Sequence, residues 1–209
     1  GASASCNQLL VFLDADIKNK DSNYDEKFWD EVSQEASLSD MKVVAVTKKT
    51  NFTVATKAHT RLDLDGVIIS EAADMTIKTK YAAQGFHVFI PTGSTCTIEK
   101  FVVMSTSRNH ELADLDSYNT ALLNQAVFKG LETLEDNHSK KWHQIWTDCD
   151  IIIEGDVAAQ QGIRFNIFQL YATYTGKDAR LNIGPKGFTG EKYGGSTYWD
   201  TEAYCLPFY

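Results

Sequence analysis

The chain has 209 residues, of which 43% are hydrophobic and 11% aromatic, so it can form a real core and is not a disordered tail. Its formal charge of −8, with no cluster of lysine or arginine, argues against nucleic acid as a partner. No apolar stretch is long enough to cross a bilayer, so no membrane association is expected. The four cysteines lack zinc-ligand spacing and suggest no disulfide framework; together with the absence of a signal-peptide pattern, this predicts a cytoplasmic protein.

Between about residues 40 and 106 the hydrophobic pattern has period two, in short runs rich in valine, isoleucine, threonine and phenylalanine. Such closely spaced runs, separated by turn residues, predict an antiparallel β-sandwich. The acidic stretch from Asp14 to Trp29 is interpreted as a loop. The expected strands are residues 43–47, 52–57, 61–70, 75–81, 86–90 and 94–106, joined as a meander by turns near Asn51, Asp65-Gly66 and Pro91-Thr-Gly93.

After residue 108 the pattern changes to helical spacing. Leucine, valine and tryptophan residues recur every three or four positions between charged residues, which predicts helices over 110–129 and 131–147. Gly130 lies between the two runs and is expected to break or kink the helix.

The remaining elements are expected to be mainly helical. A brief strand is predicted at 151–153, followed by a helix over 157–174 with Asp156 as N-cap and Gly176 as terminator. This helix carries apolar residues on more than one side, so we expect it to be buried nearly all round. A further helix is expected over 199–209.

In the segment between these last two helices, glycines alternate with charged and aromatic residues. Glycine lets a backbone approach a ligand closely, and a sugar ring requires aromatic surface for its C–H faces and carboxylates or amides for its hydroxyls. Trp199, Asp200 and Glu202 supply both kinds of group, so the segment predicts a carbohydrate site. Two plainer interpretations stay open: Trp199 as a core side chain, and the two carboxylates as charges placed against a helix dipole.

Arg164 is a charged residue on the nearly all-apolar helix expected over 157–174. We interpret it as the buried structural partner of a carboxylate, with a phosphate contact as the other interpretation. The five histidines show no metal-ligand spacing and are interpreted as surface or hydrogen-bonded polar residues.

Three runs carry a family resemblance: LDADIKNKDSNYDEKFW at 13–29, IIEGDVAAQQGIRFNIFQL at 152–170 and LNIGPKGFTGEKYGGSTYWDTEAY at 181–204. They resemble the disaccharide phosphorylases of glycoside hydrolase family 65, with maltose-cleaving members the nearest. The last two runs are the most specific, because they join a helix, a glycine loop and a Trp-Asp-Thr-Glu element in one order.

The resemblance implies a mixed β and α fold. Residues 1–106 would be the later part of an antiparallel β-sandwich domain, 107–148 a helical linker and 149–209 the first helices of an (α/α)6 catalytic barrel. Members of the family are several times longer, so we expect this chain to be a piece of a longer protein. The full-length protein is expected to be a homodimer.

The implied chemistry is inverting phosphorolysis of maltose or a related α-glucoside to β-glucose 1-phosphate and glucose. Inorganic phosphate is the co-substrate, and no metal or organic cofactor is expected. The family's general acid is a glutamate well beyond the Trp-Asp-Thr-Glu element, so no catalytic residue is assigned here and Glu202 is not taken as the acid. The expected substrate-binding residues are Trp199, Asp200, Glu191 and Tyr193. The alternative is a non-catalytic carbohydrate-binding β-sandwich module.

Overall fold

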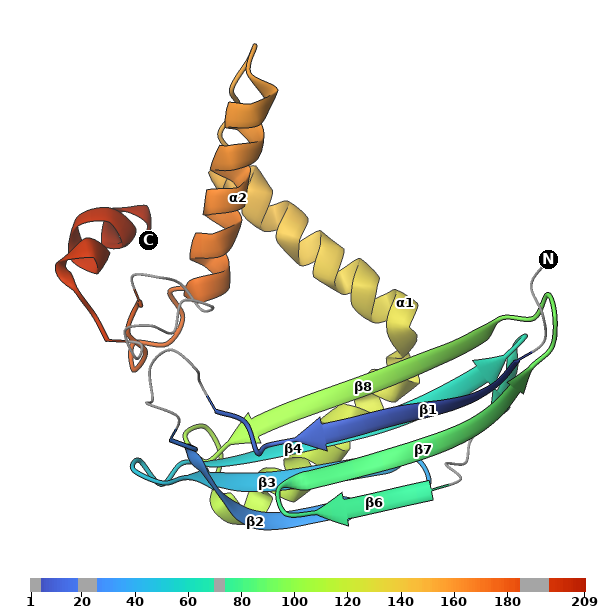
Figure 1. Cartoon of the computed structure of the whole chain (residues 1–209). Coiled ribbons are helices and arrows are strands. Elements are labelled where there is room, and N and C mark those ends of the chain that lie inside the picture. The colour runs from blue at the N-terminus through green and yellow to red at the C-terminus, as the bar shows by residue number, and fades with distance from the viewer. Residues whose placement is uncertain (1–4, 19–25, 70–73, 185–195) are drawn as a thin grey trace. The chain divides into compact units, whose positions relative to one another are not determined.

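The computed structural model describes residues 5–18, 26–69, 74–184 and 196–209, and the chain forms two compact units. The first unit comprises residues 1–17 and 27–135, and the second comprises 18–26 and 136–209. Eight strands lie in the described part of the first unit (Figure 1). They are β1 (Ser5–Asp14), β2 (Trp29–Ala36), β3 (Asp40–Thr47), β4 (Thr53–Leu64), β5 (Val67–Ile69), β6 (Asp74–Lys78), β7 (Tyr81–Ile90) and β8 (Cys96–Thr106).

The strands form two antiparallel sheets, which confirms the predicted mixed β and α fold with an antiparallel sandwich. One sheet has the order β1-β7-β6; the other has the order β2-β3-β4-β5, with β8 also paired to β4. The simple meander is wrong, because β8 returns to pair along β4 from Val54 to Leu64. The 12-residue β4 accommodates this: β3 and β5 pair with successive parts of it, and β8 pairs with nearly its whole length.

Two strands were not predicted, β1 and β2. In β1 the outward-facing Leu10 and Phe12 are apolar like their inward neighbours, so the strand shows no period-two alternation. In β2 the sequence is acidic and the register shifts between Glu31 and Ser33, as at a bulge of an edge strand. The predicted loop between Asp14 and Trp29 agrees with the residues described there, which form no regular element.

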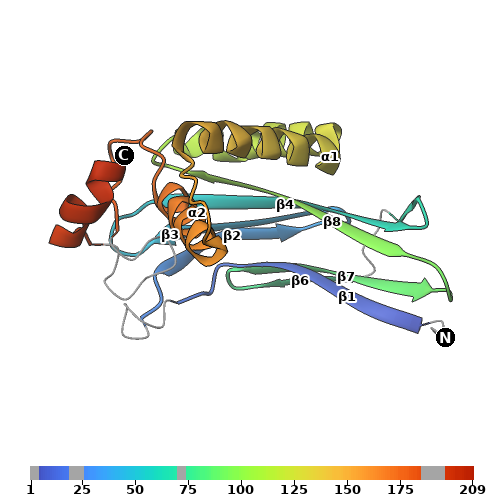
Figure 2. The same ribbon diagram turned by 90° about the horizontal axis from the view of Figure 1, so that it is seen from above.

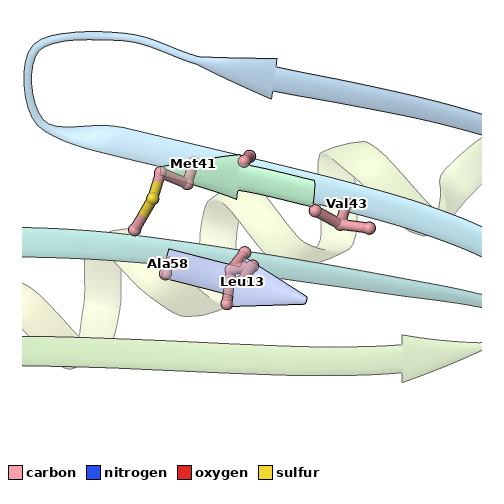
Figure 3. Close-up of a cluster of buried hydrophobic side chains, with 5 residues drawn as sticks. Leu13, Met41, Val43 and Ala58 are labelled. Carbon is pink, nitrogen blue, oxygen red and sulfur yellow. The ribbon is translucent and has the colours of Figure 1, made fainter. Parts of the chain in front are cut away.

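The core of the first unit lies between the two sheets, as Figure 3 shows for one cluster. Leu13 on β1 forms one buried cluster with Met41 and Val43 on β3, and the cluster also includes Ala58 and Ala82. A second cluster joins Leu62 on β4 to Phe86 and Val88 on β7. Full burial of a side chain such as Phe86 contributes about 1.5–3 kcal/mol to folding, so these clusters hold the sheets face to face.

One end of this sandwich carries an ion-pair cluster. The carboxylate of Asp16 pairs with Lys27 and Lys80. Hydrogen bonds from Lys27 and then Lys80 lower the pKa of Asp16 to about 2. The Lys80 ammonium also donates to the carbonyl of Trp29, 3.2 Å away. These contacts connect the chain that leaves β1 to the chain that enters β2.

Helix α1 (Leu115–Cys149) covers the outer face of the five-stranded sheet with its first half, residues 115–129. In Figure 2 the sheets form two layers, and this part of α1 lies beyond the five-stranded sheet. Leu115, Asn119 and Leu123 are buried at helical spacing, and Leu123 packs on Phe101 and Val103 of β8. The buried amide Nδ2 of Asn119 donates to the carbonyl of Ala55, 2.9 Å away on β4.

The predicted break in this helix is confirmed, because Gly130 has φ 75° and ψ 163° within the run. In the second unit, α2 (Val157–Thr173) follows residues 136–149 of α1. No strand forms at 151–153, contrary to the prediction, since the side chain of Gln160 binds this backbone instead. Among the described helices, none is long and apolar enough to cross a membrane.

Candidate functional site

The predicted site residues Trp199 and Asp200 begin the last helical segment of the second unit. Trp199 is 86% exposed, so it is not a core side chain in this chain. Asp200 is also exposed, and within the described part of the chain its carboxylate has no hydrogen-bond or ion-pair partner. The other two predicted residues, Glu191 and Tyr193, lie outside the described residues. The structure therefore places an accessible indole beside an accessible carboxylate.

The helical segment that carries these residues is not a regular α-helix. After Trp199 and Asp200 comes a π-helical turn, Thr201–Cys205, followed by a 3₁₀ turn, Leu206–Phe208. The N–H of Leu206 donates to the carbonyl of Thr201 and closes the wide turn. The predicted helix is thus helical but wider than expected. Single π turns occur frequently at functional sites.

The same segment is anchored at its base by side chains that the sequence reasoning missed. The hydroxyl of Thr201 donates to the carbonyl of Ile183, 2.9 Å away and 18 positions earlier in the chain. Both residues are buried, with Thr201 3% exposed. A second hydrogen bond joins Asn182 Nδ2 to Thr197 Oγ1 at 3.2 Å, in exposed surroundings. Together they connect residues 182–183 to the stretch that carries Trp199 and Asp200.

The end of the segment packs on α2. The hydroxyl of Tyr209 donates to the carbonyl of Leu170, and its ring lies edge-on to Tyr174 with centroids 5.3 Å apart. Phe208 makes a similar edge contact with Tyr171. Burial raises the pKa of Tyr209 to about 12, and the neighbouring Cys205 adds to the shift. The π turn is therefore held at one end by Ile183 and followed at the other by an aromatic contact with α2.

Helix α2 begins as the sequence predicts. Asp156 is the N-cap, and its carboxylate accepts the N–H of Ala159 at 2.9 Å. Gly176, with φ 74°, follows the end of the helix. Within this chain only Ile167 of α2 is buried, so its nearly all-round burial stays a prediction for the longer protein. Phe165, at 58% exposed, is one of its accessible apolar residues.

Arg164 binds a carboxylate, as one of the two interpretations expected. Its Nε donates to Asp150 Oδ1 at 2.9 Å, and its terminal nitrogen donates to Oδ2 at 2.6 Å. The hydrogen bond from Arg164 lowers the pKa of Asp150. The pair is not buried as predicted, because the arginine side chain is 49% exposed. It connects the end of α1 to α2 and uses two of the five N–H donors of the guanidinium.

A groove of about 780 Å³ runs along the same two helices. Its lining includes the aromatic rings of Trp146, Phe165 and Phe168 and the amide of Gln161. The ring of Trp142 makes tilted contacts with Trp146 and Phe168, with ring centroids 6.1 and 5.2 Å away. The groove has no nucleophile or free ionisable group among these lining residues. Among the described residues, no three His, Cys, Asp or Glu side chains come together as a metal site requires.

Two family models match the chain. The model described as glycosyl hydrolase family 65, N-terminal domain, matches residues 8–145 and thus more than half of the chain. The model described as the glycosyl hydrolase family 65 central catalytic domain matches residues 164–209. The second match includes the later part of α2, residues 164–173, and the segment that carries Trp199 and Asp200.

Individual relatives agree with these matches. The chain is 40% identical over 208 residues to maltose phosphorylase of Bacillus subtilis, covering 96% of this chain and 26% of that protein. It is 32% identical to α,α-trehalose phosphorylase of Thermoanaerobacter brockii, over 80% of this chain and 21% of that protein. A solved structure of a protein assigned as a kojibiose phosphorylase, from the human microbiome, superimposes with a TM-score of 0.85 at 25% identity. It covers 99% of this chain and 26% of that one. The chain spans about a quarter of these relatives' length, and it belongs to glycoside hydrolase family 65.

Proposed function

We propose that this chain is part of an inverting disaccharide phosphorylase that acts on maltose or a related α-glucoside. Two kinds of observation support the proposal. The family models match the N-terminal domain at residues 8–145 and the central catalytic domain at residues 164–209. The observation that supports the substrate class is the exposed indole of Trp199, followed in sequence by Asp200, whose carboxylate has no partner among the described residues.

In the proposed reaction a carboxylic acid donates its proton to the glycosidic oxygen while that oxygen leaves the anomeric carbon. An oxygen of inorganic phosphate attacks the same carbon from the opposite face, so the new C–O bond has inverted configuration. The products are β-glucose 1-phosphate and glucose. The acid and the phosphate-binding residues belong, in this proposal, to parts of the longer protein beyond this chain.

Asp200 would act on the sugar rather than on the reacting bond. A carboxylate that accepts hydroxyl hydrogen bonds contributes about 1.5–3 kcal/mol, so its loss weakens substrate engagement by roughly one to two decades. Trp199 would offer ring surface or its indole N–H to the same sugar. Both side chains are exposed in this chain.

The test compares the full-length protein that contains this sequence with the chain alone. Each is incubated with maltose and phosphate, with trehalose in parallel because a relative is named for it, and the products are followed by proton NMR. The full-length protein should release β-glucose 1-phosphate only when phosphate is present, and the chain alone should release none.

Each other result contradicts a stated part of the proposal. Glucose 1-phosphate from the chain alone would overturn the placement of the acid, and the α-anomer would overturn inversion. Release of glucose alone, independent of phosphate, would identify a hydrolase. Retention of maltose on a column without turnover by either protein would favour the carbohydrate-binding module.

A further inference from the structure

Thr201 is the buried residue in an otherwise exposed stretch. Residues 196–200 and 202–204 are all exposed, whereas Thr201 is 3% exposed. We infer that Thr201 is a positioning residue, whose hydroxyl hydrogen bond to Ile183 holds the adjacent Asp200 in the orientation that binds sugar. The inference rests on the proposed function of Asp200 and extends it to a residue that touches no substrate.

All three hydrogen-bonding groups of Thr201 are used. Its N–H donates to the carbonyl of Tyr198 at 3.0 Å, and its own carbonyl accepts the N–H of Leu206. Its hydroxyl donates to Ile183 at 2.9 Å. The backbone bonds shape the π turn, but only the hydroxyl connects this turn to a distant part of the chain. Among these three groups, the hydroxyl is therefore the one that ties the turn to residue 183.

This connection matters for Asp200 because the two residues share a peptide bond. The carboxylate of Asp200 has no partner of its own among the described residues, so its position depends on the backbone that carries it. A binding group that is already held in its bound orientation loses less conformational entropy when the ligand arrives. Loss of the anchor should therefore weaken sugar binding without removing a sugar contact.

Thr197 provides a matched control for this argument. It lies four positions earlier, and its hydroxyl also has a hydrogen-bond partner, Asn182 at 3.2 Å. In contrast to Thr201, it is exposed, so water can replace the lost partner. Thr197→Val should leave the kinetics within about twofold, whereas Thr201→Val should have a clear effect.

The test uses the full-length protein with maltose and inorganic phosphate as probes. Thr201→Val should raise KM for maltose about 3- to 10-fold, as the loss of one buried hydrogen bond predicts, with kcat changed less than about twofold. Thr201→Ser retains the hydroxyl and Thr201→Ala removes it, and both lack the methyl group. The Ser variant should therefore keep a KM close to that of the unmodified protein, while the Ala variant resembles Val.

A double-mutant cycle separates this inference from the proposed function. In the background of Asp200→Ala, adding Thr201→Val should change kcat/KM by less than about twofold, because the group that Thr201 positions is gone. If Asp200→Ala alone leaves kcat/KM unchanged, the proposed role of Asp200 is wrong. If Asp200→Ala is damaging but the effects of the two changes simply multiply, the proposed function stands and the positioning role is overturned.

The Ser and Ala pair also covers the case in which Thr201→Val does not fold, as judged by circular dichroism. A KM difference of less than about twofold between Ser and Ala would overturn the inference. Loss of folding in both Val and Ala, with Ser intact, would likewise overturn it, because the hydroxyl would then serve the fold rather than the orientation of Asp200.

Discussion

Replacing Asn119 by alanine is expected to destabilise the first unit by about 1–2 kcal/mol. Asn119 lies on the buried face of α1, 1% exposed, and its amide donates to the carbonyl of Ala55 on β4 at 2.9 Å. Alanine removes this donor at the interface between helix and sheet. The first half of α1 should then be held less firmly on the five-stranded sheet.

The magnitude follows from three contributions. Leaving the carbonyl of Ala55 without this donor in buried surroundings costs about 1–3 kcal/mol. Alanine is a better helix former than asparagine by about 0.6 kcal/mol, which offsets part of the loss. The amide oxygen of Asn119 is buried without a partner among the described residues, so its removal further reduces the loss of stability. The net loss should lower Tm by roughly 3–8 °C in a unit of this size.

Urea unfolding followed by far-UV circular dichroism measures the change, with Asn124→Ala as the matched control. Asn124 is exposed on the same helix, so the same substitution changes helix propensity without removing a buried bond. It should be neutral or slightly stabilising, by up to about 0.6 kcal/mol. If Asn119→Ala is no more destabilising than the control, the hydrogen bond does not hold α1 on the sheet.

Three further predictions concern helix ends, glycines and pH. Gly130→Ala should lower the free energy of unfolding by about 1–2 kcal/mol because φ is 75° there. Gly162→Ala, with nothing within 4 Å of the added Cβ, should instead stabilise α2 by about 0.5–1 kcal/mol. If urea unfolding shows that both substitutions stabilise or both destabilise, the helix break at Gly130 is contradicted. Asp156→Ala should cost about 1 kcal/mol and Asp156→Asn much less, seen as faster amide exchange in α2; equal losses would exclude the cap. The pKa of Asp16, about 2, lies below its ordinary value, so its contribution to stability is present above about pH 4 and is lost as pH falls toward 2. The free energy of unfolding of Asp16→Asn should lack this pH dependence. If it falls between about pH 4 and 2 as much as that of the unmodified chain, the role of the lysine partners is refuted.

Local backbone requirements were predictable from the sequence, because they depend on single residues. Turns and caps were expected at most positions where the structure has positive φ, namely Asn51, Asp65, Gly66, Gly93, Gly130 and Gly176. Lys80, with φ 57°, is an exception, because the strand predicted over 75–81 is interrupted there by the turn between β6 and β7. The N-cap at Asp156 depends on a side chain three positions from its partner, and it too was predicted. Strand pairing was harder, since the contact between β8 and β4 joins segments that are distant in sequence and leaves no local pattern.

In the candidate site, too, some residues were predictable from the sequence and others were not. Trp199 and Asp200 were identified from their chemistry and from the family resemblance, and the structure describes both as exposed. Thr201 was passed over, although it lies beside them, because nothing in a threonine reveals a partner 18 positions away. Arg164 shows the limit of hydrophobic patterns: its carboxylate partner was expected, but its exposure depends on which elements cover α2.

The most direct test of the account is a crystal structure of the full-length protein soaked with maltose. The account predicts that a carboxylate oxygen of Asp200 lies about 2.6–3.2 Å from a hydroxyl of a glucose unit, with the indole of Trp199 in contact with the same unit. A bound sugar with both side chains turned away from it would contradict the central claim.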